Sequence, residues 1–443
     1  MSTGEIITIA ISIAAVLVSL VGTLYQRRAL QQKDSELRHK FQADADEKMR
    51  QEREFRSNLT LELGKLDLEV EKFHAQQTTP EGRILEFDKA LEPADDSVDI
   101  AEAGLGLPYN DSVPIRQADR FFGRRDLLSQ VLDSTRQEMK CMALLGIRKS
   151  GKTSFLRYIE DSFTVEGFPH IVPVYLDAQS APATPNIFYS LVLRKTAAAL
   201  YARTKLGMQM PDFPKEIDFP FLESFLQTVC AQNYHFLFLL DEFENLVAED
   251  KGFDGRFFDT LRSLILVGHG QVSWITASFR PVNTPHTNTS PFENILSTRY
   301  IGPLLPEDAH QLVAVPARRF NRPFSDPDVE FILKKAGRLP FPLQKASLLL
   351  YQTRLTNMPE AQIHVHVANE FAKQMRSHYD YQYEKLSPEE RAALLQVYAG
   401  ESEQTDLTSL QTLESYGLIE RGDGEDHVLG EALVDYLYNI LKK

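Results

Sequence analysis

A glycine-rich loop between a short apolar segment and the start of a helix constrains the fold of this chain more than any other feature. The apolar segment is Met142–Leu145, the loop reads Gly-Ile-Arg-Lys-Ser-Gly over residues 146–151, and a helical pattern begins with Lys152 and Thr153. Glycines let backbone N–H groups turn inward around phosphate oxygens, and a helix N-terminus adds partial positive charge. Because the loop lies between a strand and a helix, its spacing predicts a phosphate-binding loop of the Walker A type.

The residues of this loop have separate predicted roles in binding a nucleotide. The Lys152 ammonium would reach the β and γ phosphates, and the Thr153 hydroxyl would be a ligand of Mg²⁺. The other predicted nucleotide-binding residues of the loop and the first helical turn are Gly146, Lys149, Ser150, Gly151 and Ser154. The predicted cofactors are therefore ATP or ADP together with Mg²⁺.

A second segment supports this site. The apolar segment His235–Asp241 reads as a buried strand that ends in two adjacent carboxylates, Asp241 and Glu242. We expect Asp241 to hold Mg²⁺ and Glu242 to orient and polarise the water that attacks the γ-phosphate. An acidic pair after a buried strand also fits the start of a loop, but the Walker A loop favours the functional interpretation. Glu242 and Lys152 are thus predicted catalytic residues.

Two further segments, Ile171–Asp177 and residues 271–278, have the pattern of buried strands, with helical stretches between them. Alternating strands and helices indicate an α/β fold with a parallel, doubly wound sheet whose ligands lie at the carboxyl ends of the strands. Ser278 falls at such an end and is the third predicted catalytic residue. Its hydroxyl could bind the γ-phosphate or the attacking water, or it could cap a turn.

The N-terminal part of the chain contains a long uncharged segment. Residues 6–25 carry no charge, and at about 1.5 Å per residue such a helix spans the roughly 30 Å core of a bilayer. A cleaved signal peptide is the alternative, but no basic residue precedes the segment and the apolar run exceeds a typical h-region. Lys and Arg follow it directly, so the positive-inside rule predicts a single-pass membrane protein with its N-terminus outside and its remaining domains in the cytoplasm.

Two connecting segments follow. Residues 26–76 are dense in charged residues and glutamine and almost free of glycine and proline, which predicts a helical stalk. The apolar spacing in its second half is compatible with a coiled coil, and a single solvated helix is the alternative. Residues 77–118 collect prolines and glycines among acidic residues, which predicts a linker.

The composition limits the possible partners. The formal net charge is −14, which argues against a protein that mainly coats nucleic acid, although a local basic patch stays possible. The only two cysteines, Cys141 and Cys230, lack metal-ligand spacing and suggest neither a disulfide framework nor a zinc site.

With these residues in view, the chain resembles the AAA+ and STAND ATPases, in particular the archaeal-type group, and more distantly the origin-recognition ATPases. The resemblance covers residues 119–440. A Phe-x-Gly-Arg-Glu box of the family is matched by residues 121–125, where Arg125 replaces the glutamate, and it implies that Phe122 and Gly123 lie against adenine. A Gly-x-Pro-like lid motif is matched by residues 337–340, so Pro340 would contact the nucleotide.

The resemblance also points to two arginines that could act on a neighbouring subunit. Arg280 follows the strand that ends at Ser278, and Arg299 precedes Pro303 and Leu304. An arginine finger stabilises charge on the transferred phosphoryl group, which would make hydrolysis depend on a homo-oligomer that forms on ATP binding. For each arginine, an ordinary ion pair is the alternative.

The C-terminal residues 387–443 have the predicted order helix, helix, strand, turn, strand, helix, which is typical of a winged helix. Its second helix, residues 406–416, contains no Lys or Arg. Because DNA affinity depends on neutralising phosphates, nucleic acid is an unfavoured partner, and a protein contact or an autoinhibitory role is expected.

The complete prediction is an α/β P-loop NTPase with a parallel sheet, a helical lid and a C-terminal winged helix, preceded by a transmembrane helix and a stalk. The predicted domains are an ATPase core at 119–304, a lid at 305–380 and a winged-helix-like domain at 381–443. The predicted function is a membrane-anchored, ATP-hydrolysing molecular switch in signalling or assembly. The alternatives are a nucleotide-binding scaffold with little turnover and a defence effector that acts on membranes.

Overall fold

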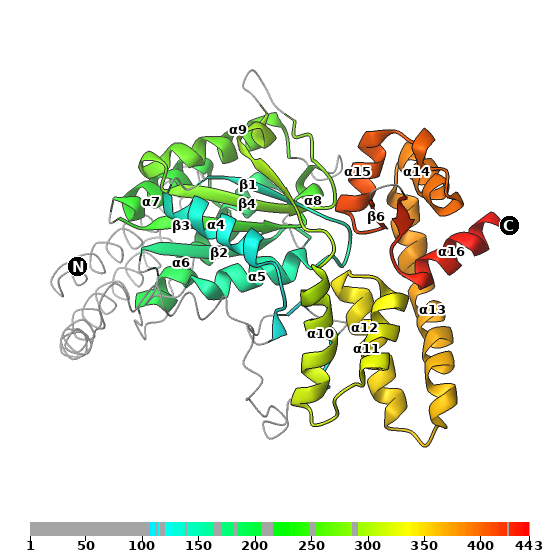
Figure 1. Cartoon of the computed structure of the whole chain (residues 1–443). Coiled ribbons are helices and arrows are strands. Elements are labelled where there is room, and N and C mark those ends of the chain that lie inside the picture. Colours follow the sequence, from blue (N-terminus) through cyan, green and yellow to red (C-terminus); the bar gives the residue numbers. More distant parts are fainter. Residues whose placement is uncertain are drawn as a thin grey trace, which may run out of the picture.

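The computed structural model of the chain (Figure 1) describes residues 107–110, 114–115, 120–137, 140–163, 168, 170–179, 184–204, 216–231, 233–247, 253–285, 291–422 and 425–442. The predicted membrane segment 6–25, the stalk 26–76 and most of the linker 77–118 lie outside these residues. The glycine-rich loop and both acidic residues of the second motif lie within them.

The predicted single-pass membrane localisation is contradicted and is corrected here. No helix in the described ranges combines the length and the apolar composition needed to cross a bilayer. The longest of these helices, α13 (Glu360–Lys385, 26 residues) and α6 (Pro185–Thr204, 20 residues), both carry charged side chains. A charged side chain within a bilayer core costs several kcal/mol, about 3 kcal/mol at its centre.

A five-stranded parallel sheet forms the centre of the fold and confirms the predicted α/β class. Its strand order is β2-β3-β4-β1-β5, so the strand before the glycine-rich loop pairs with β4 and β5. The strands are β1 (Met142–Leu145), β2 (Ile171–Asp177), β3 (His235–Asp241), β4 (Val272–Ser278) and β5 (Ser297–Tyr300). The register brings Asp177 level with Asp241, and Leu145 level with Ser278. The polar ends of these strands therefore meet at one edge of the sheet.

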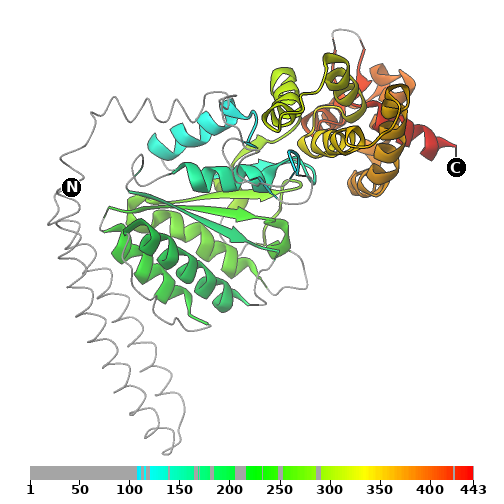
Figure 2. The same ribbon diagram turned by 90° about the horizontal axis from the view of Figure 1, so that it is seen from below.

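Helices cover both faces of this sheet, as Figure 2 shows. On one face, α4 and α5 bury Leu132 and Phe155 against Leu237 and Leu239 of β3. On the other face, α6, α7 and α9 enclose Trp274 and the neighbouring phenylalanines. The covering elements are α4 (Arg125–Gln137), α5 (Lys152–Ser162), α7 (Phe219–Cys230), α8 (Glu244–Val247), α9 (Gly255–Ser263), and the 3-10 turns η4 (Leu264–His269) and η5 (Phe292–Ile295). Burial on both faces explains why the strands are nearly continuous apolar runs.

A helical region, residues 306–441, follows the sheet and lies at the end where the strands finish (Figure 1). Besides α13, it contains α10 (Pro306–Arg319), α11 (Asp326–Ala336), α12 (Pro340–Arg354), α14 (Pro388–Ala399), η6 (Ser402–Gln404), α15 (Leu407–Ser415), β6 (Ile419–Glu420), β7 (His427–Val428) and α16 (Glu431–Leu441). One hydrophobic cluster runs through all of its α-helices and includes Phe122 and Ile147 of the sheet domain. The predicted boundary between residues 380 and 381 falls inside α13.

Local sequence signals set several helix ends in this region. Ser387 and Glu390 form a capping box at the start of α14, and Ser325 and Asp328 form one at the start of α11. Such boxes satisfy backbone N–H groups that have no partner within the helix.

Close contact between the sheet domain and the helical region depends on Gly302, where an added Cβ would lie 2.5 Å from the carbonyl oxygen of Ser415.

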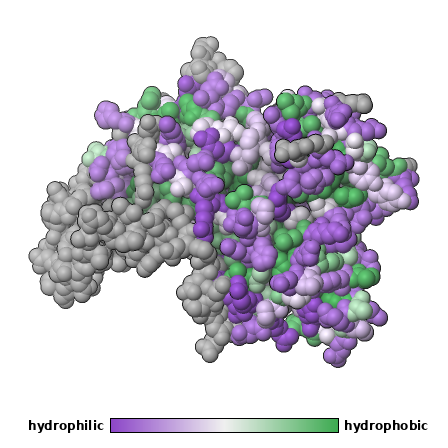
Figure 3. Space-filling view, in the orientation of Figure 1, coloured by the Kyte–Doolittle hydropathy of each residue, from purple (hydrophilic) through white to green (hydrophobic). Residues whose placement is uncertain are grey.

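The surface of the described residues is mixed in character. Hydrophilic side chains cover most of the face seen in Figure 3, and hydrophobic side chains are scattered among them over both the sheet domain and the helical region. Scattered apolar side chains of this kind are ordinary on protein surfaces.

A buried carboxylate, Asp328, joins three elements of the helical region. Its Oδ1 accepts hydrogen bonds from Arg354 at 2.7 Å and bonds His364 at 2.8 Å, while Oδ2 accepts from the Ser325 hydroxyl at 2.9 Å. Burial alone would raise the pKa of Asp328, but the bonds from Arg354, His364 and Ser325 outweigh burial and hold the pKa below 3.8. The stabilisation is therefore present above pH 3.8 and is lost as the pH falls through the folded-state value.

We expect Asp328→Asn to lower the free energy of unfolding by about 3 kcal/mol, because it removes the buried charge that pairs with the half-buried Arg354. Glu360→Gln is a matched control: Glu360 pairs with the same Arg354, but its side chain is 73% exposed. That exposed pair should contribute no more than about 1 kcal/mol. Chemical unfolding at pH 7 measures both changes, and equal effects of the two substitutions would contradict the prediction.

Candidate nucleotide-binding site

The glycine-rich loop leaves β1 and turns directly into α5, as its sequence predicted. The backbone N–H of Gly146 donates to the carbonyl of Ser278 at 3.2 Å, which ties the start of the loop to the end of β4. An added Cβ at Gly146 would lie 2.7 Å from both Ser150 Oγ and the Ile301 carbonyl oxygen, so the loop has no room for a side chain there. Gly151 has a φ of 102° and is the N-cap of α5. Both glycines are required by the shape of the loop.

Lys152 begins α5 and folds back over this loop. Its ammonium is buried and donates to the carbonyls of Gly146 at 2.7 Å and Ile147 at 3.1 Å. Burial lowers the pKa of Lys152, whereas the negative charges of Glu242, Glu244 and Asp241 oppose that shift. The cation therefore lies close enough to the carboxylates at the end of β3 to be stabilised by them.

The carboxylates at the end of β3 occupy different environments. Asp241 is 2% exposed and accepts hydrogen bonds from the Tyr175 hydroxyl at 2.9 Å and from the Glu242 backbone N–H at 3.0 Å. Glu242 has a φ of 52°, in the left-handed region that a non-glycine residue adopts only at a cost of about 1–3 kcal/mol. Burial raises the pKa of Glu242, and the charge of Glu244 raises it further, against the opposing effect of Lys152. A strained, half-buried carboxylate beside a buried lysine is typical of a functional site.

Several polar atoms at this edge of the sheet are buried and have no hydrogen-bond partner among the described residues. They are Ser150 Oγ, Thr276 Oγ1 and Glu244 Oε2. The Ser278 hydroxyl, in contrast, donates to the carbonyl of Arg280 at 2.7 Å. This bond corresponds to the turn-capping alternative for Ser278, and a direct role toward phosphate stays a prediction.

These residues fit a magnesium nucleotide. A Cβ at Gly146 would collide with its neighbours, so the backbone of the loop is closely packed there. The Ser150 hydroxyl lies beside Gly146 and has no hydrogen-bond partner among the described residues. Thr153 and Asp241 offer hydroxyl and carboxylate oxygens, which are the ligand types that Mg²⁺ prefers. No group of three or more His, Cys, Asp or Glu in the described part of the chain is arranged to hold a metal ion. A magnesium ion here would therefore also use phosphate oxygens and waters.

The predicted adenine-side residues lie where the sheet domain meets the helical region. Phe122 is buried in the same cluster as Ile147 and Leu339. A Cβ at Gly123 would lie 2.6 Å from the Asp308 carboxylate, so this segment contacts α10 closely.

Arg124 follows in the same box and is half-buried. Its guanidinium donates to the carbonyls of Gly302 and Pro303, and to the Ser150 carbonyl at 3.5 Å. Burial lowers the pKa of Arg124 to about 10, against the opposing charge of Asp308. The arginine thus connects the glycine-rich loop to the segment that leads into the helical region.

Helices α12 and α13 lie directly over the loop. Pro340, the first residue of α12, has its Cγ 3.8 Å from the position of an added Cβ at Gly151. The Lys149 ammonium lies 4.9 Å from the centre of the Phe341 ring, and the Arg148 guanidinium lies 4.8 Å from the centre of the Tyr381 ring. The loop and the helical region therefore share contacts through cation–π pairs.

Ser154 lies in the first turn of α5, and its contact with a nucleotide stays a prediction. Its hydroxyl accepts a hydrogen bond from the Ile115 backbone N–H at 3.0 Å. The structure therefore brings together Gly146, Ser150, Lys152, Asp241 and Glu242, while the Ser154 hydroxyl bonds the segment that precedes the sheet domain.

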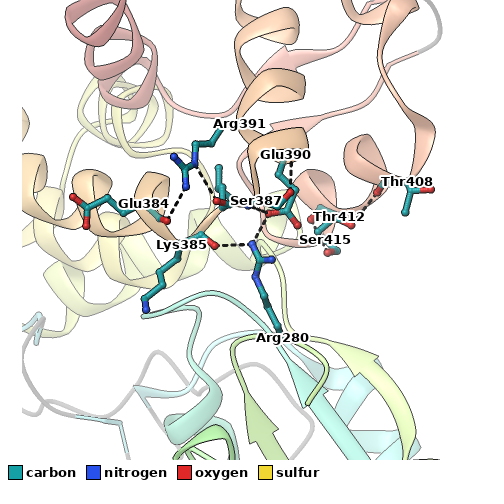
Figure 4. A network of polar contacts seen from close by, with 10 residues as sticks. Arg280, Glu384, Lys385, Ser387, Glu390, Arg391, Thr408, Thr412 and Ser415 are labelled. Carbon is teal, nitrogen blue, oxygen red and sulfur yellow. Dashed lines mark hydrogen bonds and ion pairs between the residues drawn. The ribbon is translucent and has the colours of Figure 1, made fainter. Parts of the chain in front are cut away.

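The two candidate finger arginines differ in their surroundings. Arg280 donates to the Lys385 carbonyl at 2.6 Å and forms an ion pair with Glu390, so it reaches from the end of β4 to α13 and α14 (Figure 4). This geometry corresponds to the ion-pair alternative. Arg299 is exposed on the edge strand β5, where its Nε donates to the Gln130 side chain at 2.9 Å.

Sequence reasoning missed three residues of this site. Arg124 stood in the quoted box without a role, and Glu244 lies two residues after Glu242. Tyr175 lies in the strand Ile171–Asp177, and only the register that pairs Asp177 with Asp241 shows that it faces Asp241. The signal for Tyr175 would have been a parallel pairing of β2 with β3. Paired residues on neighbouring strands point to the same face of the sheet, and so do residues two apart on one strand.

A family model matches the part of the chain that carries this site. The model of the family described as novel STAND NTPase 1 matches residues 112–401. A Walker-type ATPase of Pyrococcus abyssi is similar in structure, with a TM-score of 0.49, 12% identity, and coverage of 75% of this chain and 100% of that chain. The ORC2 protein of Aeropyrum pernix, in ADPNP and ADP complexes, has a TM-score of 0.42, 13% identity, and coverage of 75% and 95%.

A RuvB variant of Thermotoga maritima has a TM-score of 0.36, 13% identity, and coverage of 74% and 97%. At these scores, the structural neighbours do not bear on the activity of this chain. No relative was found among proteins of curated function. The family match, in contrast, covers well over half of the 443 residues, including the glycine-rich loop and both acidic residues. It confirms the STAND part of the predicted resemblance and a nucleotide-binding, NTPase-type function, and the chain belongs to the novel STAND NTPase 1 family.

Proposed function

We propose that this protein is a molecular switch that binds ATP with Mg²⁺ and hydrolyses it, with turnover that is slow or dependent on assembly. The observation that carries the proposal is the meeting of Lys152, Asp241 and Glu242 at the carboxyl end of a parallel sheet. Lys152 is the first residue of α5, Asp241 is the last residue of β3, and Glu242 follows it. Ligands of such sheets bind at this edge.

Each residue has a distinct task in the proposed reaction. Lys152 would exchange its bonds to the Gly146 and Ile147 carbonyls for bonds to the β and γ phosphates. Thr153 and Asp241 would hold Mg²⁺, which when bound neutralises charge on the phosphates. Glu242 would orient the attacking water and accept its proton, a task suited to a carboxylate whose pKa is raised.

The proposed switch couples this site to the helical region. We assign residues 119–304 to the ATPase core, 305–380 to a lid and 381–443 to a winged-helix-like domain. Because Lys149 and Arg148 contact Phe341 and Tyr381, a phosphate that attracts the loop cations would weaken their contacts with α12 and α13. Helix α15 contains no Lys or Arg, which favours a protein as the partner of the C-terminal domain over nucleic acid.

The nucleotide base is proposed to lie near the junction of the two regions. Gly123 lies against Asp308 of α10, Pro340 lies 3.8 Å from the position of a Cβ at Gly151, and both Phe122 and Leu339 belong to one hydrophobic cluster. An adenine placed there would contact both regions at once. This would make the position of the lid sensitive to bound nucleotide.

A second candidate function is a nucleotide-binding scaffold with little turnover. It is favoured by one observation: the Lys152 ammonium already has two carbonyl partners in its own loop. A lysine held in this way would need a rearrangement before it could contact phosphate.

The proposal predicts that Glu242→Gln keeps ATP binding and loses phosphate release. Turnover should fall at least about a hundredfold, because a general base contributes about 10² to 10⁴ to a rate. Glu307→Gln, at an exposed carboxylate on α10, is the control and should leave turnover unchanged. Phosphate release with excess Mg²⁺ and ATP is the measurement. If the unaltered protein turns over ATP no faster than the Glu242→Gln variant, alone or assembled, ATPase activity is refuted and the scaffold is favoured.

Nucleotide affinity should separate the two lysines of the loop. Lys152→Ala is expected to weaken ATP binding about ten- to a hundredfold, since a hydrogen bond to a charged group contributes about 1.5–3 kcal/mol. Lys149→Ala removes the cation over Phe341 and should change affinity by no more than about fivefold. Calorimetric titration of both variants checks the prediction, and an equal loss in the two would show that the loop binds phosphate in another way.

The proposed homo-oligomer gives a further prediction for the full chain. A non-hydrolysable ATP analogue should raise the mass measured by light scattering to a multiple of that seen with ADP. If Arg299 acts on the neighbouring subunit, Arg299→Ala should lower assembled turnover at least about a hundredfold, because a finger contributes about 10³ or more. Arg256→Ala, at an exposed arginine on α9, is the control. A monomer with both nucleotides would contradict assembly.

A further inference from the structure

The side chain of Tyr175 connects β2 to the predicted metal ligand on β3. Tyr175 lies two residues before Asp177, which is level with Asp241, so the tyrosine and Asp241 share one face of the sheet. The phenol is 6% exposed, and its hydroxyl donates to Asp241 Oδ2 at 2.9 Å within the buried interior. This contact joins residues that are 66 positions apart in the chain.

The bond completes the support of the Asp241 carboxylate. Oδ1 accepts from the backbone N–H of Glu242 at 3.0 Å, and Oδ2 accepts from Tyr175. A carboxylate has about four lone-pair positions, so these two bonds leave others for a metal ion or its waters. Two donors on different oxygens fix the rotation of the carboxylate plane. A neutral hydroxyl achieves this without cancelling the negative charge that attracts a cation.

Tyr175 is itself held by the helix that begins at the glycine-rich loop. The Arg157 guanidinium lies over the Tyr175 ring, with its Cζ 3.2 Å from the ring centre, and pairs with Glu160 at 2.8 Å. Arg157 follows Thr153 by four residues, about one turn of α5. The helix that carries one predicted magnesium ligand thus supports, through Arg157 and Tyr175, the side chain of the other.

We propose that Tyr175 is a positioning residue that orients Asp241 for a divalent cation, and that Arg157 keeps the tyrosine ring in place. The proposal rests on the proposed function, since it needs a magnesium nucleotide at this site. Residues that bond to metal ligands typically contribute about 10- to 100-fold in metal affinity or activity. The effect should therefore be seen in the dependence of nucleotide binding on Mg²⁺, and not in nucleotide binding without the metal.

The test is a titration of the full chain with Mg²⁺. At each Mg²⁺ concentration, the equilibrium binding of a fluorescent, non-hydrolysable ATP analogue is measured. Tyr175→Phe is expected to raise the half-saturating Mg²⁺ concentration about tenfold, while binding in EDTA stays within about twofold. Tyr189→Phe is the matched control, because Tyr189 is also a buried tyrosine with a hydroxyl partner, Thr260, but lies on α6. It should leave the Mg²⁺ dependence unchanged.

A second variant keeps the test decisive if Tyr175→Phe fails to fold, which the fluorescence of the buried Trp274 would report. Arg157→Gln acts at a side chain that is 21% exposed, and it should shift the Mg²⁺ dependence in the same direction by about threefold. An unchanged half-saturating concentration in the folded variants, or an equal loss of binding with and without Mg²⁺, overturns the positioning role but leaves the proposed function standing. If the unaltered protein binds the analogue without any effect of Mg²⁺, both proposals are wrong.

Discussion

The carboxyl edge of the parallel sheet depends on opposite charges that are buried together. The Lys152 ammonium and the Asp241 carboxylate are both nearly inaccessible to water, at 7% and 2% exposure. Either charge alone would be costly in this position, and each lowers the cost of the other. Glu242 and Glu244 also stabilise the Lys152 cation, although the two carboxylates repel each other. The backbone bond from Gly146 to Ser278 fixes the separation between the loop and these strands. The rest of the site is arranged around this group.

The same loop is also part of the contact between the sheet domain and the helical region. Ile147 belongs to the hydrophobic cluster of α10–α16, and Arg124 bonds both the loop and the segment at Gly302 and Pro303. Arg280 adds a polar connection from β4 to Glu390 (Figure 4). A bound phosphate that shifts the loop would therefore disturb the packed and hydrogen-bonded contacts between the sheet domain and the helical region. Such contacts resist gradual deformation, so the two regions would change between discrete arrangements.

Local patterns in the sequence were sufficient for much of this site. The spacing of Gly146, Gly151 and Lys152 and the acidic end of His235–Asp241 predicted the loop and the strand that the structure contains. The periodicity also predicted the helices and short strands of residues 387–443 in their observed order. The predicted membrane localisation is contradicted by the helices of the described residues. The predicted boundary between residues 380 and 381 lies inside the continuous helix α13, and the division into a lid and a winged-helix-like domain stays a prediction.

The sequence by itself determined the chemistry that is encoded within a few residues: a phosphate-binding loop, adjacent carboxylates and buried strands. The tertiary structure decided which distant side chains meet them. Tyr175 reaches Asp241 across 66 positions and Arg280 reaches Glu390 across 110, and neither pairing follows from local spacing. The physical reason is that strand order and register place these residues together, and both are set by the packing of the whole sheet and its helices.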